Sequence, residues 1–417
     1  MNSSIFTRLF SAAAALLLDG CAHGSLRPAL AAPATVRTAA FRDALAAETM
    51  TPWTTGNSVR TLENGDGFFP PMLRAAAGAR SSITFECYTA ADCETVAAFS
   101  RILAGRAQAG VKVHVILDAF GCGHWGARNI RMMRKAGVQV KFYGLFHILN
   151  PLAYSHRTHR RVLVVDGSTG FCGSAGFAWN WTGHAEDREH WRDTQYELRG
   201  PVVAQLQDSF SGHWRELAGA ALHGRDYYPS LAEAGNLTAQ MVAGSPLAQG
   251  DTIGVSCLLA IRTARHSILM EQSYFVPPDE ITDALIAASA RGVRVQLILP
   301  GKITDMPFIK EVTLRILAKL MKAGVEIYEF QPTMMHGKLI AVDDHFVIAG
   351  SANLDARSFF INDENNLQVL NTGFAREQRR MFERDRERCT RLTEGTLRIN
   401  PVRRLRGFAG QIFIQIL

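Results

Sequence analysis

Two stretches of this chain carry the same pattern of polar residues, and this repeat constrains the fold more than any other feature. The segments HRRVLVVD and HGKLIAVD each place a basic residue two positions after a histidine and an aspartate seven positions after it. The two histidines and the two aspartates are both separated by 177 residues (336 − 159 and 343 − 166). Such a repeat indicates two homologous halves. The repeated residues are His159, Arg161 and Asp166 in the first copy and His336, Lys338 and Asp343 in the second.

The repeat extends beyond these motifs into the segments that precede them. A strand-like run from Ile83 parallels one from Ile268, and MRKAGVQVKFYG parallels LMKAGVEIYEFQ. Helical patterns over residues 95–109, 127–136, 280–291 and 307–323 each end near a glycine and lead into a β-rich run. Helices that alternate with such strands predict an α/β layered fold in each half.

The length of 417 residues suits two domains with terminal extensions. We expect an N-terminal domain over residues 53–225 and a C-terminal domain over residues 226–400. Residues 22–52, rich in Ala, Pro and Arg, are predicted to be a tether. Residues 401–417 place three arginines before an apolar tail, which suits an anionic bilayer interface, although packing onto the domain would also explain them.

The N-terminus reads as a secretion signal that ends at a cysteine. Arg8 precedes the apolar run LFSAAAALLL, which is shorter than the ~20 residues that a membrane-spanning helix needs. Cys21 after this run resembles the lipidation site of a bacterial lipoprotein, with an ordinary or uncleaved signal as the alternative. We therefore expect residues 1–21 to be a signal peptide, and the protein to be lipid-anchored in the bacterial envelope, facing the periplasm.

Charge and cysteine content set weaker limits. A net charge of +7 favours anionic partners such as phospholipid head groups or nucleic acid. None of the seven cysteines has the paired C-x-x-C spacing of a zinc site, and the sequence does not say which of them pair.

The polar residues around the second motif suggest the chemistry. An imidazole beside a fixed cation, next to a small-residue turn with Ser and Asn donors, suits an anion with tetrahedral oxygens, such as a phosphodiester. Because side chains at i and i+2 of a strand share a face, His336 and Lys338 are expected to point the same way. Glu86 and Tyr88 are interpreted as a hydrogen-bonded pair at a strand end, with a role in a site as the alternative. The downstream turn contains Gly350, Ser351, Asn353, Asn362 and Glu364, and the first half contains Gly173, Ser174 and Asp193.

At this point the sequence resembles the phospholipase D superfamily, and within it the bacterial cardiolipin synthases with two motifs per chain. The signature H-x-K-x4-D is complete in the second motif, GSANLDARSFFINDE is similar to the downstream elements, and WRDTQYELRGPVV is similar to the region between the halves. The likeness covers roughly residues 53–400. It implies two α/β/α sandwich domains related by a pseudo-twofold, with one active site at their interface.

The resemblance also assigns roles. His159 would attack phosphorus to form a phosphohistidine, and His336 would protonate the leaving alcohol and deprotonate the incoming one. Glu364 would hold His159 and Asp193 would hold His336. Phosphoryl oxygens would bind to the basic residues and to the polar residues of the small-residue turns, whereas Asp166 and Asp343 would brace the motifs; neither a metal nor a cofactor is required. The expected oxygen-binding residues are Arg161, Lys338, Asn353, Ser351 and Ser174.

Two positions depart from the family pattern. Arg161 stands where a lysine is usual, which keeps the charge but presents a planar fork instead of a compact ammonium. Gly176 stands where the first half would carry the counterpart of Asn353. Because loss of one oxyanion donor can cost about 10²–10³-fold in rate, slow turnover or an altered substrate is expected.

The function that follows is a phosphatidyltransferase that makes cardiolipin from phosphatidylglycerol at a membrane surface. The expected partners are anionic phospholipids, namely phosphatidylglycerol and cardiolipin, and not nucleic acid; one chain is sufficient for one site. The alternatives are a hydrolytic phospholipase D and a non-catalytic phospholipid-binding protein on a degenerate scaffold.

Overall fold

The computed structural model describes residue 26 and residues 35–145, 155–245, 250–395 and 397. After helix α2 (Ala39–Thr49), the N-terminal half contains, in order, β1 (Thr54–Glu63), α3 (Asn64–Ala77), β2 (Ser82–Cys87), α4 (Glu94–Gln108), β3 (Lys112–Asp118), α5 (Ala127–Lys135), β4 (Gln139–Tyr143), β5 (Val162–Val165), β6 (Thr169–Gly173), η2 (Trp179–Trp181), β7 (Thr194–Arg199) and α6 (Val202–Ala218).

The C-terminal half repeats this succession. It contains β8 (Leu237–Gly244), α8 (Thr252–Thr263), β9 (Ser267–Glu271), β10 (Phe275–Val276), α9 (Asp279–Ala290), β11 (Arg294–Pro300), α10 (Pro307–Lys322), β12 (Glu326–Phe330), β13 (Leu339–Val342), β14 (Phe346–Gly350), β15 (Leu354–Asp355), α11 (Ala356–Phe360), β16 (Glu364–Leu370), α12 (Thr372–Glu387) and β17 (Cys389–Arg391).

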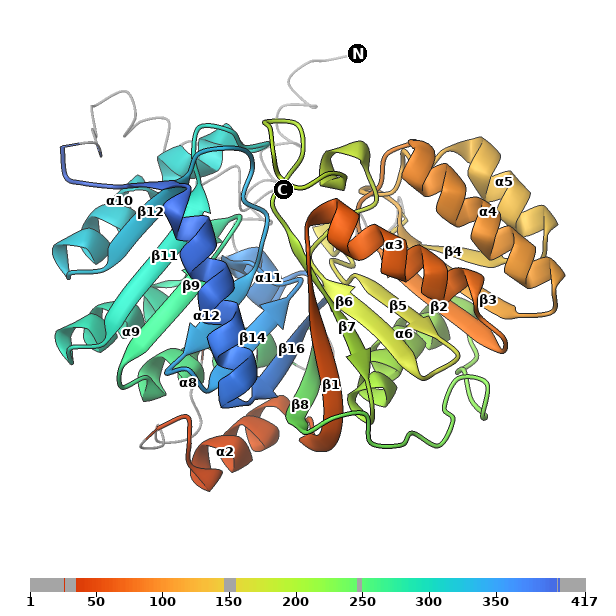
Figure 1. Cartoon of the computed structure of the whole chain (residues 1–417), viewed down its shortest axis with the longest axis horizontal. Coiled ribbons are helices and arrows are strands. Elements are labelled where there is room, and N and C mark those ends of the chain that lie inside the picture. Colours follow the sequence, from red (N-terminus) through yellow and green to blue (C-terminus); the bar gives the residue numbers. More distant parts are fainter. Residues whose placement is uncertain (1–25, 27–34, 146–154, 246–249, 396, 398–417) are drawn as a thin grey trace, which may run out of the picture.

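All but two of the described strands form one 15-stranded sheet that passes through both halves, with β1 and β8 meeting at the centre (Figure 1). From the outside inward, the N-terminal half has the order β4-β3-β2-β5-β6-β7-β1, and the C-terminal half has the order β12-β11-β9-β13-β14-β16-β8, with β17 added at its edge. The two orders match strand for strand. The predicted fold, two homologous α/β sandwich halves related by a pseudo-twofold, is therefore confirmed.

Helices cover both faces of the sheet, and the side chains of each strand alternate between these two faces. In β2, Ile83 and Phe85 join the core formed with α3 and α4, whereas Thr84 Oγ1 donates a hydrogen bond to Gln207 of α6 at 3.0 Å. In β9, Ile268 and Met270 pack in the core with α8 and α9, whereas Leu269 faces the core that contains α12. Successive side chains of a strand point to opposite faces, so each half is an α/β/α sandwich.

The prediction of a tether over residues 22–52 is wrong for its described C-terminal part. Phe41 and Leu45 of α2 are fully buried in the core of the C-terminal half, and the Phe41 ring lies edge-on to Phe346 at 5.1 Å. Trp53 Nε1 donates to the carbonyl oxygen of Arg42 at 2.9 Å and ties the following segment back to the first turn of the helix. Apolar side chains spaced along one helix face stabilise this packing, and the Ala-rich composition concealed them in the sequence.

Several predictions fall on residues outside the described ones. These are the signal peptide 1–21 with Cys21, most of the first part of the tether, and the tail 401–417. Within the described ranges, no helix combines the length and the apolar character needed to cross a bilayer. The six cysteines that these ranges contain are all free thiols.

Candidate active site

The two motif aspartates form matching turns, one in each half. Asp166 accepts hydrogen bonds from the backbone N–H groups of residues 80–82 at 2.7–3.0 Å, and Asp343 accepts those of residues 265–267 at 2.7–3.0 Å. Both aspartates have φ of 52°, a left-handed conformation that Asp tolerates better than most residues. Each carboxylate thus fixes the loop before β2 or β9 to the hairpin after the motif, as the sequence analysis expected of a bracing residue.

The motif histidines lie just before the strands, rather than within them as the sequence suggested. β13 begins at Leu339 and β5 begins at Val162. The backbone before these strands bonds across to the other half: His159 N–H donates to the Asp363 carbonyl at 2.8 Å and His336 N–H donates to the Arg192 carbonyl at 2.7 Å. These crossings bring each histidine to a carboxylate of the opposite half.

His159 is paired with Glu364 at the start of β16. Its Nδ1 lies 2.8 Å from Glu364 Oε1, and the Glu364 carboxylate also accepts from Ser351 Oγ and, at 2.7 Å, from Ser358 Oγ. The ring of Tyr88 packs edge-on against the His159 ring with centroids 4.7 Å apart. Because Nδ1 is occupied by the carboxylate, Nε2 is the ring nitrogen that remains for a ligand.

His336 is paired in the same manner with Asp193, just before β7. Its Nδ1 lies 2.7 Å from Asp193 Oδ2, which also accepts from Trp181 Nε1 at 2.8 Å, while Ser174 Oγ donates to Asp193 Oδ1. The rings of Trp181 and Trp191 lie 5.2 and 5.6 Å from the imidazole. The two histidine–carboxylate pairs predicted from the resemblance are therefore both present as contacts.

Ser174 and Ser351 occupy different places from those predicted. The sequence analysis assigned both hydroxyls to phosphate oxygens, but each donates to the carboxylate beside it and is almost fully buried, and neither lines the cavity that contains the histidines. A carboxylate in a buried site needs donors, and these hydroxyls supply them. The two serines therefore contact the carboxylates that hold the histidines, on the side away from the cavity.

Both histidines line a cavity of about 520 Å³ between the two halves. Its polar lining includes Arg161, Asn353, Arg357 and Asn362, which are donors suited to an anion. The lining also includes apolar side chains that are more exposed than the two histidines, namely Phe120, Val276, Met306, Phe308 and Ile309. The cavity therefore combines an anion-binding centre with an apolar entrance, which suits an amphiphilic phosphodiester.

The two cations of the motifs are held differently. Lys338 Nζ donates to Ser273 Oγ at 2.7 Å and lies 3.4 Å from His336 Nε2, and Ser273 in turn donates to Asn353 Oδ1 at 3.0 Å. The Arg161 guanidinium instead lies over the ring of Tyr88 at 5.3 Å, and its buried Nε has no acceptor among the described residues. Ser273 and Tyr88 occupy equivalent positions, two residues after Glu271 and Glu86. The two halves therefore differ both in the motif cation, Lys338 or Arg161, and in the residue that contacts it.

Gly176 has no space for the side chain that the second half carries at Asn353. A Cβ at Gly176 would lie 2.5 Å from Thr89 Cγ2 and 2.9 Å from Trp181 Cζ3. Trp181 is the residue that donates to Asp193, in the position where the other half has Ser358. The first half has therefore lost an amide donor and gained an indole that holds its carboxylate.

Burial shifts the pKa of most of these groups. It lowers the pKa of His336 to about 4, with the Lys338 charge acting in the same direction, and it lowers the pKa of His159 well below the ordinary value. Burial also lowers the pKa of Lys338 to about 7 and raises that of Glu364 to about 7. Without a ligand, both imidazoles are thus neutral at neutral pH, and the Lys338 charge depends on an anion nearby.

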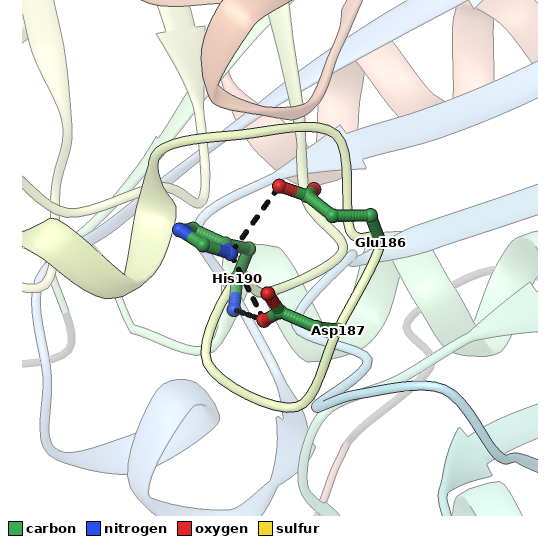
Figure 2. Close-up of side chains that lie close together, drawn as sticks. All are labelled: Glu186, Asp187 and His190. Carbon is green, nitrogen blue, oxygen red and sulfur yellow. Dashed lines mark hydrogen bonds and ion pairs between the residues drawn. The ribbon is translucent and has the colours of Figure 1, made fainter.

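The loop between η2 and β7 holds Trp191 against His336. Figure 2 shows the His190 ring beside the carboxylates of Glu186 and Asp187, with Nδ1 at 3.3 and 2.9 Å from them. The ligand atoms of these three side chains lie within 4.8 Å of one another, close enough to share a metal ion, but the carboxylates are exposed and do not line the cavity. Their bonds to one another, and that of Arg388 to the Ala185 carbonyl at 2.7 Å, account for the shape of the loop.

A larger cavity of about 680 Å³ lies between the segment after α2 and helix α6, but neither histidine of the motifs lines it. Its buried cation, Arg160, donates to the carbonyl oxygens of Ser209, Gly244 and Glu364 at 2.7–3.2 Å. The chemistry therefore belongs to the smaller cavity.

Sequence reasoning missed several residues of the site. Tyr88 was assigned to a structural pair, yet it lines the cavity and contacts His159 and Arg161. Ser358 and Trp181 hold the carboxylates but share no residue type, so comparing the two halves by identity does not find them. Alignment by position within each half, with Gly176 set against Asn353, would have paired Trp181 with Ser358. Trp191, Tyr274, Asp305 and Arg357 also line the cavity.

Comparison with known proteins identifies the family to which the chain is similar. Residues 72–214 and 258–386 match the family described as "Cardiolipin synthase, PLD-like domain". Cardiolipin synthase A of Pseudomonas aeruginosa (strain LESB58) is 34% identical over 343 residues, which cover 82% of this chain and 69% of that protein. Cardiolipin synthase 2 of Bacillus cereus is 32% identical over 337 residues, or 80% of this chain and 65% of that protein. The crystal structure of phosphatidylserine synthase from Haemophilus influenzae has the same fold, with a TM-score of 0.65 at 13% identity over 91% of this chain and 98% of that one.

Proposed function

This chain belongs to the cardiolipin synthase family of phospholipase D-like proteins, and from this premise we propose that it is a phosphatidyltransferase that joins two phosphatidylglycerol molecules into cardiolipin and releases glycerol. One observation carries the proposal. Two imidazoles, each held at Nδ1 by a carboxylate of the opposite half, line one cavity together with Arg161.

In the first step, neutral His159 attacks the phosphorus through Nε2. An N–P bond forms, the P–O bond to glycerol breaks, and His336 gives a proton to the leaving oxygen. The lowered pKa of His159, due first to burial, keeps this nucleophile unprotonated. The phosphodiester anion favours the protonated form of His336, opposing the effects of burial and Lys338.

In the second step, His336 takes the proton of a glycerol hydroxyl on a second phosphatidylglycerol, whose oxygen attacks the phosphohistidine. The O–P bond forms and the N–P bond breaks, which restores both histidines. Arg161, Lys338 and Asn353 compensate the charge on the phosphoryl oxygens, and the anion keeps Lys338 protonated despite its lowered pKa.

The apolar entrance of the cavity suits acyl chains at a membrane surface, which supports a site that takes lipids rather than nucleic acid. We extend the proposal to an envelope protein anchored through Cys21 and facing the periplasm, with one chain forming one complete site. The supporting features are the signal-like segment of residues 1–21 and the two carboxylates, which both come from the same chain as the histidines.

The test is to incubate the purified protein with phosphatidylglycerol in detergent, beside the His159→Ala and His336→Ala variants, and to resolve the lipids by mass spectrometry. We expect cardiolipin and glycerol with the unaltered protein and neither product with the variants. Phosphatidic acid without cardiolipin would replace the transferase with a hydrolytic phospholipase D. Bound but unchanged phosphatidylglycerol would indicate a binding protein.

A further inference from the structure

A carboxylate lines the anion-binding cavity without an evident task in the chemistry described above. Asp305, in the loop between β11 and α10, accepts a hydrogen bond from Tyr274 Oη at 2.6 Å, and both residues line the cavity. The other carboxylate in the lining, Asp355, accepts from the Ser358 N–H at 2.8 Å and caps α11. Asp305 is exposed to the cavity and to solvent, so it is open to a further donor.

A negative charge in this place opposes the binding of a phosphodiester unless another part of the ligand uses it. Two side chains, the cationic Arg161 and Arg357, favour the phosphate at the centre of the cavity, and a carboxylate beside them weakens that attraction. Carboxylates accept hydrogen bonds and donate none when ionised, so the matching ligand group is a hydroxyl or an amine.

Asp305 lies on the His336 side of the cavity. The Tyr274 ring, which carries the hydroxyl that orients Asp305, lies edge-on to the His336 ring with centroids 6.4 Å apart. Burial raises the pKa of Tyr274 well above its ordinary value, with Asp305 acting in the same direction, so the phenol stays a donor. On the proposed mechanism, the alcohol that leaves and the alcohol that enters both exchange their proton with His336. Both alcohols therefore lie on the side of the cavity that contains Asp305.

We propose that Asp305, oriented by Tyr274, accepts hydrogen bonds from the hydroxyl groups of the head-group glycerol and thereby selects a polyol over water or a simple alcohol as the acceptor. This inference rests on the proposed transferase function and specifies its acceptor site. The glycerol that leaves and the glycerol of the second phosphatidylglycerol both carry a secondary hydroxyl on the carbon next to the one that bears the reacting oxygen, so one carboxylate can serve both steps. Asp305 is a specificity residue, and Tyr274 is a positioning residue.

The size of the effect follows from the hydrogen bond. A bond from a neutral hydroxyl to a charged acceptor, made with one acceptor alcohol and not with the other, changes their relative rates by roughly 10- to 100-fold. Loss of the Tyr274 hydroxyl leaves the carboxylate in place but less well oriented. Its effect is therefore expected to be smaller, at roughly 3- to 10-fold.

The experiment offers two free acceptors in competition. The full-length protein is mixed with phosphatidylglycerol in detergent micelles, labelled glycerol and 1-propanol, and the ratio of labelled phosphatidylglycerol to phosphatidylpropanol is measured for the unaltered protein, Asp305→Ala and Tyr274→Phe. Asp283→Asn, which removes an exposed charge on α9 outside the cavity, is the matched control. Total consumption of phosphatidylglycerol and formation of phosphatidic acid are recorded in the same samples.

We expect the unaltered protein and Asp283→Asn to prefer glycerol, Asp305→Ala to lose that preference at least 10-fold, and Tyr274→Phe to fall between them. A turnover loss in Asp305→Ala with an unchanged ratio would overturn the inference while leaving the transferase function intact. In a parallel competition between ethanolamine and labelled glycerol, an Asp305-dependent preference for ethanolamine would also overturn it, because the carboxylate would then recognise an amine. Absence of turnover in the unaltered protein would remove the proposed function and this inference with it.

Discussion

The two half-sites share their scaffold and their histidine–carboxylate pairs but differ in every group that would face the phosphate. The second half pairs Lys338 with Ser273 and Asn353 in a chain of hydrogen bonds, whereas the first half sets Arg161 over the Tyr88 ring and has no side chain at position 176. The strand order is the same in both halves, and so are the aspartate turns. The two halves thus share the scaffold and the histidine–carboxylate pairs, while their oxygen-binding groups differ.

This difference is expected if, as proposed, the two halves carry out different steps of the reaction. A nucleophile and a general acid need the same orientation of the ring, which would account for the similar carboxylate pairs. They do not need the same surroundings: His336 has Trp181, Trp191 and Tyr274 around it, and His159 has Tyr88. Four measurements test this division of roles.

The largest expected effect separates the two histidines by the step that each serves. With a phosphodiester whose leaving group is p-nitrophenol, which needs no proton, His336→Ala should still form a covalent phosphohistidine, whereas His159→Ala should form none. With phosphatidylglycerol, both variants should lose at least about 10³-fold in turnover. Protein quenched with denaturant at alkaline pH, where the N–P bond is stable, and analysed by mass spectrometry gives the site and amount of phosphorylation. Phosphate found on His336 of the unaltered protein would reverse the assignment.

The next effect concerns the carboxylates, which differ in their ionisation. Burial raises the pKa of Glu364 to about 7, whereas Asp193 has a lowered pKa because His336 and Lys338 outweigh the effect of burial. The ionised form holds the imidazole, so activity should fall as the pH drops below about 7 and Glu364 takes up a proton. Glu364→Gln and Asp193→Asn should each lose roughly 10²–10⁴-fold at pH 8.

The pH profile distinguishes the two variants. Asp193→Asn should keep the decrease below pH 7, because Glu364 still titrates, and Glu364→Gln should lack it. The measurement is initial rate from pH 5.5 to 9 with phosphatidylglycerol at saturation. A decrease in rate that persists in Glu364→Gln and disappears in Asp193→Asn would contradict the prediction, because Asp193 would then be the titrating carboxylate.

A smaller effect tests the exchange of Arg for Lys. Arg161→Lys should lose about 10-fold in kcat, because an ammonium stacks less well on Tyr88 and cannot present a planar fork. Lys338→Arg should lose more, about 10²-fold, because Lys338 is enclosed with its Nζ 2.7 Å from Ser273. Steady-state rates for both variants decide the order, and an Arg161→Lys variant faster than the unaltered protein would show that the first half is impaired by its arginine.

The two α/β halves were predictable because the repeat indicates them, and it also places His159 and His336 at corresponding positions 177 residues apart. The pairing of these histidines with Glu364 and Asp193 came from the resemblance to the phospholipase D superfamily, and the strand order came from the structure. The missed parts depend on contacts between segments distant in sequence. Ser174 and Ser351 reach the carboxylates because β6 pairs with β7 and β14 pairs with β16, and Tyr88 reaches His159 because β2 lies beside β5. Residues 35–52 were read from composition, which does not show the two apolar side chains of α2 that are buried.

The smallest effect on activity, and a distinct one on stability, is expected at Glu271. Glu86, its counterpart, bonds to His213 Nδ1 at 2.7 Å and to Thr158, but both oxygens of Glu271 lack a hydrogen-bond partner among the described residues. Burial raises the pKa of Glu271 to about 8; Asp385, Glu63 and Asp193 act in the same direction and Arg192 opposes them. The folded protein thus holds a neutral acid behind His336, 3.0 Å from where a Cβ on Gly337 would lie.

The sign of the pH dependence follows from this shift. The unfolded chain ionises Glu271 near its ordinary value of 4.5 and the folded protein near 8, so its contribution to stability is complete below 4.5 and is lost as the pH rises to 8. Glu271→Gln does not titrate, so its stability relative to the unaltered protein should rise by about 1.4 kcal/mol per pH unit across this window and then level off. Urea unfolding at pH 5, 7 and 9 measures the difference, with Glu86→Gln as the control that weakens a paired carboxylate. A difference that does not change with pH would mean that folding does not raise the pKa of Glu271, and that the two halves are more alike behind their histidines than the hydrogen bonds indicate.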